Sequence, residues 1–468
     1  MVFSSSEFLF FFLPFVLAAY FGLMRGRGAK NLFLTLVSLF FYAWGEPWFV
    51  FVMLASIAFN WLCALEIDKR RGTKGAKAWL TFSVIGDLAL LGAFKYLMFV
   101  LENVNLAFGA NIPVPKILLP IGISFFTFQA MSYVIDVYRG NGKVQKNFMN
   151  VCLYVSFFPQ LIAGPIVRYQ TVADEITERF ENLDDFTNGA RRFMVGLGKK
   201  VILANSLALL VDNAFSHAPS ELSVVGAWMG AIAYLWQVYY DFSGYSDMAI
   251  GLGRMFGFHF LENFDYPMIS RSITEFWRRW HISLGSWFRD YLFIPLGGSR
   301  VKSTWRLLFN MFVVWSLTGL WHGAYWKYLF WGIGFFIFLA FERLTGLSKK
   351  LDKQPLGVLY AMIAVTTITV LIRSDSMTYA SGFIGSMYGV GANGFWDATA
   401  AMYVREYGVF VALALLIGLP VGRFVKEKLR VPERAYEILS AVGLIAVFVV
   451  SVSYIVMGGY NPFIYFNF

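Results

Sequence analysis

Long apolar runs recur along this chain, and they constrain its fold more than any other feature. A helix that crosses the hydrocarbon core of a bilayer needs about 20 mostly apolar residues. The pattern therefore predicts an all-α, polytopic membrane protein with about ten or more crossings. The runs that reach or approach spanning length are Ser6–Met24, Leu32–Ala43, Phe49–Leu65, Ala78–Val100, Ile117–Val137, Val195–Val211, Leu222–Val238, Leu307–Leu320, Tyr328–Phe341, Leu356–Ile372, Val409–Leu419 and Ile438–Met457.

Composition agrees with these runs. The apolar residues make up 58% of the 468 residues and the charged residues only 15%, whereas soluble domains are about 45–50% apolar and about 25% charged. The first run begins almost at Met1 and lacks a basic segment before it, so we expect a retained span rather than a cleaved signal peptide. A soluble fold is excluded, and one membrane-embedded domain over residues 1–468 is expected.

Basic residues lie in the loops between the runs. The net charge of +10 therefore indicates how the chain is oriented in the membrane, and it does not indicate nucleic-acid binding. Arg25–Lys30, Lys69–Lys77 and Arg271–Arg306 are rich in Lys and Arg, as short cytoplasmic loops are. This alternation places both termini on the outer side of the membrane. It also places Arg373–Arg405 and Asn461–Phe468 outside.

Three segments do not read as plain spanning helices. Phe157–Pro165 and Phe276–Pro295 are too short or too polar, so we expect tilted or re-entrant segments there that line a cavity. The mixed charges of Arg168–Asn188 predict an amphipathic helix on the inner surface.

Four histidines are candidates for chemistry. His217 reads as a surface residue, and His259 reads as interfacial packing. His322 ends an apolar run inside Ser316–Gly323, where small residues leave space beside the ring. An imidazole there suits proton transfer at neutral pH. The same pattern also fits a core histidine bonded to a backbone carbonyl.

His281 lies in Glu275–Asp290, where tryptophans alternate with arginines. Arginines bind phosphate in a bidentate manner and tryptophans stack on a nucleobase or cover an acyl chain, so the segment suits a pocket for an anionic ligand. An aromatic belt with snorkelling arginines is the alternative.

Other chemistries lack their motifs. The sequence contains no metal-ligand spacing, Gly-rich phosphate loop or nucleophile elbow. Cys63 and Cys152 lie in apolar runs and predict no disulfide framework. Asp241 and Asp247 do not form the charged relay of a proton-coupled transporter.

Several of these motifs together resemble one family. Trp277–Asp290 with Trp321-His322-Gly323 is similar to the membrane-bound O-acyltransferase family. The resemblance extends over nearly the whole chain and is strongest to the bacterial branch that O-acetylates alginate, cellulose or peptidoglycan. The segments that carry this second resemblance are Met1–Ser5, Phe41–Trp44, Phe158–Pro165 and Tyr240–Asp247.

The resemblance implies a ring of tilted helices around a thin centre with a through-tunnel. It places the catalytic histidine at His322 and the second polar active-site position at His281. It implies acetyl-CoA as the acyl-donor substrate and no permanently bound cofactor. The residues expected to contact the donor are Trp277, Arg278, Arg279, Trp280, Ser283, Trp287 and Arg289.

The C-terminal sequence, residues 462–468, resembles the acyl-transfer motif of the small partner peptide in teichoic-acid D-alanylation. That resemblance implies that Tyr465 is an external acyl relay. Because nothing in the sequence resembles a carbohydrate-binding domain, the partners expected are an extracytoplasmic SGNH-type (Ser-His-Asp) acetyltransferase and a polysaccharide synthesis or export complex. An aromatic anchor at the outer interface is the alternative for these residues.

Three other functions stay open on the sequence alone. One is a lipid or small-molecule O-acyltransferase, which a preference for long-chain acyl-CoA would support. The second is a polysaccharide transporter, which predicts repeat symmetry and broken helices in both halves. The third is a non-catalytic scaffold in a polymer-synthesis complex.

Overall fold

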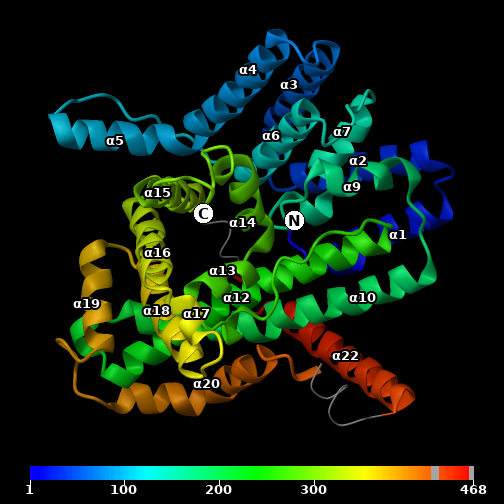
Figure 1. Ribbon diagram of the computed structural model, residues 1–468. Helices are drawn as coiled ribbons and strands as arrows, with labels where there is room; N and C mark the ends of the chain where they lie inside the picture. Colours follow the sequence, from blue (N-terminus) through cyan, green and yellow to red (C-terminus); the bar gives the residue numbers. More distant parts are fainter. Residues whose placement is uncertain (423–431, 463–468) are drawn as a thin grey trace. The chain divides into compact units, whose positions relative to one another are not determined.

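The computed structural model describes residues 1–422 and 432–462, and every regular element in those ranges is a helix (Figure 1). Seven helices there are long and apolar enough to cross a membrane. The prediction of an all-α, multi-pass membrane protein is confirmed. The seven are Phe49–Lys69, Lys74–Phe108, Leu183–Ser216, Trp326–Thr345, Leu356–Arg373, Ala398–Ile417 and Glu433–Val456.

Seven such helices are fewer than the ten or so crossings that the apolar runs predict. α2 (Arg27–Ala43) and α6 (Ile123–Arg139) have 17 residues each, which gives about 26 Å, less than the roughly 30 Å of hydrocarbon. α12 (Val224–Met255) is 32 residues long but contains Asp241 and Asp247. Most of α6 is buried by other helices, so its apolar run reflects protein packing as much as contact with lipid.

The helices gather into two compact units. The first unit comprises Met1–Phe193 and Ser246–Leu261. Its helices are η1 (Phe8–Phe12), α1 (Leu13–Gly22), α2, α3 (Phe49–Lys69), α4 (Lys74–Leu91), η2 (Gly92–Tyr96), α5 (Leu97–Phe108), α6, α7 (Phe148–Ser156), α8 (Phe158–Leu161), α9 (Tyr169–Glu178), most of α10 (Leu183–Gly198) and the end of α12.

The second unit comprises Met194–Tyr245 and Glu262–Phe468. It contains most of α12. Its other helices are η3 (Lys199–Ala204), α11 (Asn205–Ser216), η4 (Pro219–Glu221), η5 (Pro267–Ile269), α13 (Ile273–Arg279), α14 (Ile282–Phe288), η6 (Arg289–Phe293), α15 (Thr304–His322), α16 (Trp326–Thr345), α17 (Leu347–Leu351), α18 (Leu356–Arg373), α19 (Met377–Met387), α20 (Ala398–Ile417) and α22 (Glu433–Val456).

In the first unit, the predicted amphipathic helix Arg168–Asn188 is two helices, α9 and α10, with a break at residues 179–182. The buried guanidinium of Arg179 accounts for the break. It donates to Asn31 Oδ1 at 2.7 Å and to the carbonyl of Phe256 at 3.0 Å. An arginine enclosed in this way needs acceptors from several elements, and a continuous surface helix cannot provide them.

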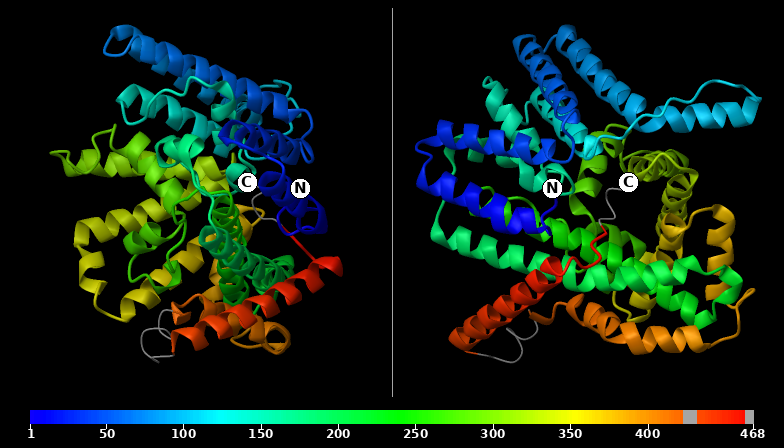
Figure 2. Two further views of the ribbon diagram at one scale, coloured as in Figure 1. Left: turned by 90° about the vertical axis from the view of Figure 1, so that its right-hand side faces the viewer. Right: turned by 180° about the vertical axis from the view of Figure 1, so that it is seen from behind.

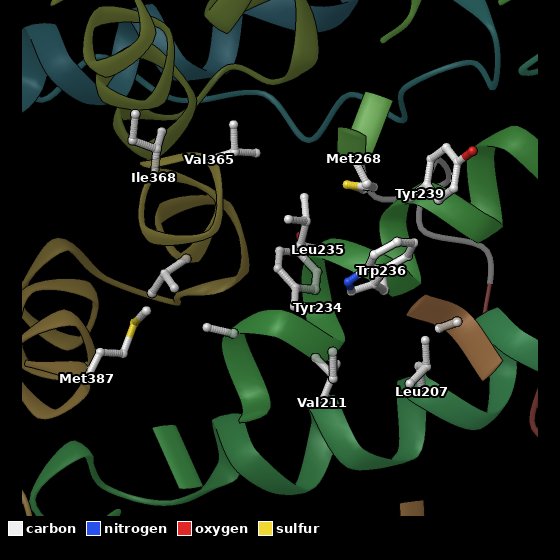
Figure 3. Packing of buried hydrophobic residues seen from close by; sticks show 14 of the residues in the cluster. Leu207, Val211, Tyr234, Leu235, Trp236, Tyr239, Met268, Val365, Ile368 and Met387 are labelled. Atoms are coloured by element: carbon white, nitrogen blue, oxygen red, sulfur yellow. The ribbon is translucent and has the colours of Figure 1, made fainter. Parts of the chain in front are cut away.

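In the second unit, one apolar core joins α11, α12, α18 and α19. Figure 3 shows Val211, Tyr234, Val365, Ile368 and Met387 converging from these four helices. Ile273, Phe276 and Trp280 belong to the same core. The core therefore anchors the beginning of the segment Glu275–Asp290.

The segment Phe276–Pro295 is broken into short pieces, as its sequence predicts. α13 and α14 have seven residues each and η6 has five, so none of them has the length to span a bilayer. Phe157–Pro165 in the first unit is similarly interrupted, with α8 only four residues long.

The last described helix, α22, packs against η3 of the second unit, and Figure 2 shows α22 in red from two further sides. A Cβ at Gly198, directly before η3, would lie 2.4 Å from Val447 Cγ1 of α22. The absence of a side chain at Gly198 therefore lets α22 approach closely, and this brings the chain after Val456 back to the second unit.

Candidate active site

His281 occupies a strained position between α13 and α14. Its backbone is left-handed, with φ 45° and ψ 52°, and among the described residues Tyr266 is the only other non-glycine with positive φ. Two backbone bonds brace the turn, from Asp265 N–H to the carbonyl of Arg279 and from Ile282 N–H to the carbonyl of Asn263, each 2.9 Å. Such conformations persist where the surroundings fix them, and they gather at functional sites.

The side chain of Asn263 defines the tautomer of His281. The backbone N–H of Ser283 can only donate, and it lies 3.2 Å from Asn263 Oδ1, so that atom must be the oxygen. His281 Nδ1, 3.2 Å from the same oxygen, must then carry the proton. Nε2 of the neutral ring holds the lone pair and has no hydrogen-bond partner among the described residues. His281 is 1% exposed, so it is a buried acceptor.

His322 is the last residue of α15, and close packing of α15 against α16 holds its ring. The imidazole lies edge-on to Trp331 of α16, with ring centroids 5.0 Å apart. Trp321 contacts both imidazoles, at 5.1 Å from His322 and 6.1 Å from His281. The two histidines are near enough that a charge on one acts on the other.

The glycines around His322 have a different role from the one predicted. Instead of leaving space beside the ring, they allow the two helices to touch. A Cβ at Gly323 would lie 2.2 Å from the Tyr328 ring, and one at Gly332 would lie 2.3 Å from the carbonyl oxygen of Trp315. The volume beside each glycine is filled by the facing helix.

This packing gives a stability prediction. Gly332→Ala should lower the stability of the folded protein by about 1–3 kcal/mol, because the new methyl group meets a backbone oxygen that cannot move aside. Gly334→Ala on the same helix is the matched control, since its Cβ would meet Ile368 methyl groups at 3.6 Å, an ordinary contact. Thermal unfolding in detergent measures both. Equal melting temperatures for the two variants would contradict the packing argument.

Three of the cavities lined by described residues of the second unit are named here by their chemistry. The arginine cavity, about 340 Å³, is lined by residues of α13, α14, η6 and α15, among them Trp277, Arg278, His281 and Arg289. Arg278 is exposed and makes no hydrogen bond or ion pair among the described residues. An unpaired guanidinium at a cavity wall is available to an anionic ligand.

The histidine cavity is much smaller, about 50 Å³, and holds His322. That volume corresponds to roughly three or four water molecules. Its other walls are mostly aromatic, including Phe242, Trp280 and Trp331. The indole nitrogens of Trp277 and Trp331 are buried and have no hydrogen-bond partner among the described residues, so two N–H donors lie unused in residues that line this cavity.

The tyrosine cavity, about 680 Å³, is lined by Tyr234, Tyr325, Tyr328 and Tyr460 together with charged residues. Among the charged residues, Arg373 and Asp212 form an ion pair of 2.9 Å.

The three cavities share walls in a fixed order. Trp277 lines both the arginine and the histidine cavity, whereas Tyr234 and Ile372 line both the histidine and the tyrosine cavity. His322 therefore lies in a narrow middle chamber between two larger ones. A continuous tunnel stays a prediction.

The residues predicted to contact the donor fall into two groups, those that line one of the cavities and those that do not. Trp277, Arg278 and Arg289 line the arginine cavity, and Trp280 lines the histidine cavity. The other three line none of the three cavities, and each contacts residues close to it. These are Arg279, bound to Glu275 and Asp265; Ser283, bound to Asn263; and Trp287, packed on Phe288 and Tyr291.

The remaining candidates lie elsewhere. His217 lies 3.6 Å from Glu221 at the surface, and His259 is bonded to Glu175 at 2.8 Å in the first unit. Tyr465 lies outside the described residues. Across residues 1–422 and 432–462, no three His, Cys, Asp or Glu side chains gather around a point where a metal ion would fit.

Sequence reasoning missed Asn263 and Trp331. Asn263 follows a turn 18 residues before His281, and no motif in the sequence connects the two positions. Trp331 lies one helix beyond His322, and its apolar surroundings resemble those of any buried aromatic residue.

Known proteins resemble this chain over the region that contains the candidate site. The sequence profile of the membrane-bound O-acyltransferase family matches residues 143–351, which include both histidines. The probable alginate O-acetylase of Pseudomonas putida is 38% identical over 493 residues, covering 100% of both chains. The probable alginate O-acetylase of Pseudomonas aeruginosa is 43% identical, covering 91% of this chain and 81% of its own.

A third relative, the peptidoglycan O-acetyltransferase of Helicobacter pylori, is 37% identical, covering 73% of this chain and 70% of its own. The chain is a membrane acyltransferase, and it belongs to the membrane-bound O-acyltransferase family. Within that family it lies in the branch of the alginate O-acetylases.

Proposed function

We propose that this chain is the membrane subunit of an exopolysaccharide O-acetylation system, which takes acetyl groups from cytoplasmic acetyl-CoA and passes them across the inner membrane towards a polymer such as alginate or cellulose. The single observation that carries the proposal is the order of the cavities, with His322 in the narrow chamber between a cationic cavity and a tyrosine-rich one. The full-length similarity to probable alginate O-acetylases supports the choice of substrate class.

The arginine cavity is the proposed entrance for the donor. Most of its lining residues lie in Arg271–Arg306, whose basic character is typical of a cytoplasmic segment. The phosphates of acetyl-CoA would meet Arg278 and Arg289, and the thioester would pass Trp277 towards His322. The tyrosine cavity includes Arg373 and Met377, at the start of the segment predicted to be external.

Arg278→Gln should raise KM for acetyl-CoA about tenfold or more and leave kcat nearly unchanged, because a charge-assisted bond to phosphate contributes to donor binding alone. Arg279→Gln is the matched control, since that guanidinium is already bound to Glu275 and Asp265. Release of free CoA by the purified protein measures both. An unchanged KM in Arg278→Gln would remove this arginine from the donor site.

The chemistry proposed for His322 is general base catalysis. His322 removes the proton of an acceptor hydroxyl, the oxygen attacks the thioester carbonyl, and the C–S bond breaks as the C–O bond forms. The imidazolium returns the proton to the leaving thiolate, which gives CoA and an acetyl ester.

The tautomer of His281 limits what that residue contributes. Because its Nδ1 proton is bonded to Asn263, the neutral ring presents an acceptor at Nε2 and cannot donate to the carbonyl oxygen. Orienting an N–H or O–H of the bound substrate suits it better than polarising the thioester. The unused indole N–H groups of Trp277 and Trp331 are the donors suited to a developing oxyanion.

The size of the histidine cavity favours a short acyl group. With about 50 Å³ between aromatic rings, it suits an acetyl group and offers no room for a long chain. The purified protein should therefore release CoA from acetyl-CoA at least about a hundredfold faster than from palmitoyl-CoA, since a mismatched chain must displace packed side chains. Faster turnover of palmitoyl-CoA would instead support a lipid acyltransferase.

The proposed route beyond His322 uses the C-terminal sequence. Tyr465 would accept the acetyl group, and an extracytoplasmic SGNH-type acetyltransferase in the polysaccharide synthesis or export complex would collect it from the acetyl-tyrosine. The resemblance of residues 462–468 to an acyl-transfer motif motivates this step. Replacing Tyr465 with phenylalanine, which removes only the accepting oxygen, tests it.

A further inference from the structure

The second unit buries an ion pair that the proposed chemistry does not use. Lys200 of η3 and Asp241 of α12 are each 2% exposed, and Lys200 Nζ lies 2.5 Å from Asp241 Oδ1. Removing two charges from water costs as much as their attraction returns, so a packed apolar pair of similar size is often equally stable. Stability alone therefore gives no reason for the pair.

The ammonium of Lys200 has a second partner, and this partner indicates a role for the ion pair other than stability. It donates to the backbone carbonyl of Pro462, six residues from the end of the chain. This bond comes from a charged group that Asp241 already holds in place, so the acceptor meets a donor with a fixed position. A carbonyl of the C-terminal segment thus accepts a hydrogen bond from a buried cation.

Two more contacts tie the same segment to the same helix. Asn205 Nδ2 donates to Asn461 Oδ1 at 3.3 Å, and the phenol of Tyr460 donates to Asp212 Oδ2 at 2.6 Å. The hydrogen bond to Asp212 raises the pKa of the Tyr460 phenol, which keeps it a donor.

The order of these contacts along the chain defines the direction of the C-terminal segment. Tyr460, Asn461 and Pro462 meet η3 and α11 in reverse order, from Asp212 back to Lys200. Those two helix positions are separated by about 18 Å along the helix axis, at 1.5 Å per residue. The segment after α22 therefore runs antiparallel to α11, with long side chains at both ends making up the distance.

This path follows a cavity wall. Asp212, Tyr460 and Pro462 all line the tyrosine cavity, which shares Tyr234 and Ile372 with the chamber of His322. The last described residues thus lie at the wall of the cavity next to the proposed catalytic base.

We propose that Lys200 and Asp241, with Asn205 and Asp212, form a docking site for the C-terminal segment and fix the position from which residues 463–468 begin. These four are positioning residues. The docking itself stands on the described contacts, and only its purpose, presenting an acyl acceptor, rests on the proposed function.

The test measures docking without any donor. A chain carrying Asn205→Cys and Asn461→Cys is treated with a short bis-maleimide, and the cross-linked peptide is quantified by mass spectrometry. The native Cys63 and Cys152 are both buried. Adding Lys200→Met and Asp241→Leu together removes the pair without leaving one buried charge behind, and the yield should fall at least about tenfold.

Lys199→Met, one residue away and less buried, is the matched control and should keep the yield. An unchanged yield in the Lys200→Met and Asp241→Leu chain would overturn the proposal. Tyr460→Phe gives a second test that does not depend on a core substitution, since Tyr460 is 50% exposed. It should lower the yield several-fold, and a yield equal to that of the parent would also count against docking.

The cross-linking result distinguishes the docking proposal from the proposed acyl relay at Tyr465. If the cross-link responds as expected while Tyr465→Phe leaves polymer acetylation intact, docking is supported and the relay is lost. If the cross-linking yield is unchanged by all of these substitutions, docking is overturned even if Tyr465 proves essential.

Discussion

His322→Ala is expected to lower acetyl transfer about a thousandfold or more, the largest effect of any single substitution outside the C-terminal sequence. A positioned general base contributes roughly 10²–10⁴-fold, and a phenolic acceptor such as the one proposed at Tyr465 is a weak nucleophile without such a base. An unperturbed phenol has a pKa of about 10, so at neutral pH nearly all of it carries its proton. Because His322 is 9% exposed in a chamber of about 50 Å³, a water molecule from bulk solvent does not readily replace it.

The measurement is CoA release from acetyl-CoA together with acetyl content of the polymer in cells. His217→Ala is the matched control, since that histidine is a surface residue beside Glu221. Melting of the His322→Ala protein shows whether the loss of packing against Trp331 has unfolded it. A folded His322→Ala protein that acetylates polymer at the parent rate would exclude general base catalysis at this position.

Tyr465→Phe is expected to reduce polymer acetylation to the level of cells that lack the protein. The substitution removes one oxygen, the proposed acceptor, and keeps the aromatic ring that an interfacial anchor would need. The two interpretations of residues 462–468 thus predict opposite results, because an anchor tolerates phenylalanine whereas a relay does not.

Tyr454→Phe is the control for this second experiment, since Tyr454 is a 40% exposed tyrosine near the end of α22. It should acetylate as the parent does. Full acetylation by Tyr465→Phe would remove the relay and leave His322 as base for another acceptor.

How far the sequence predicts this molecule depends on the range of each interaction. The class of fold and most of the helices follow from the length of apolar runs, which is a local property. The interruption of Phe276–Pro295 also follows locally. The number of helices able to span the membrane does not follow from the apolar runs. α6 and α12 are enclosed by other helices, so their apolar composition reflects burial by protein.

The site divides in the same way. His322 and His281 are found from their motifs, but what each can do depends on residues distant in sequence. Asn263 sets the tautomer of His281, and that bond is visible only in three dimensions. The glycines beside His322, Gly319 and Gly323, suggest open space in the sequence, and the space proves to be filled by Tyr328.

The C-terminal segment is the clearest case of a long-range effect. Its sequence predicts an external position and gives no sign of which part of the chain it contacts. Lys200 and Pro462 are 262 residues apart, and no sequence motif connects them. Only the fold shows that it bonds to the tail.

Mass spectrometry of the C-terminal peptide, after the purified protein is incubated with isotopically labelled acetyl-CoA, tests the central claim most directly. We predict a labelled acetyl group on Tyr465 in the parent protein and none in His322→Ala. An unlabelled C-terminal peptide, in a preparation that still acetylates its polymer together with its partner enzyme, would contradict the claim.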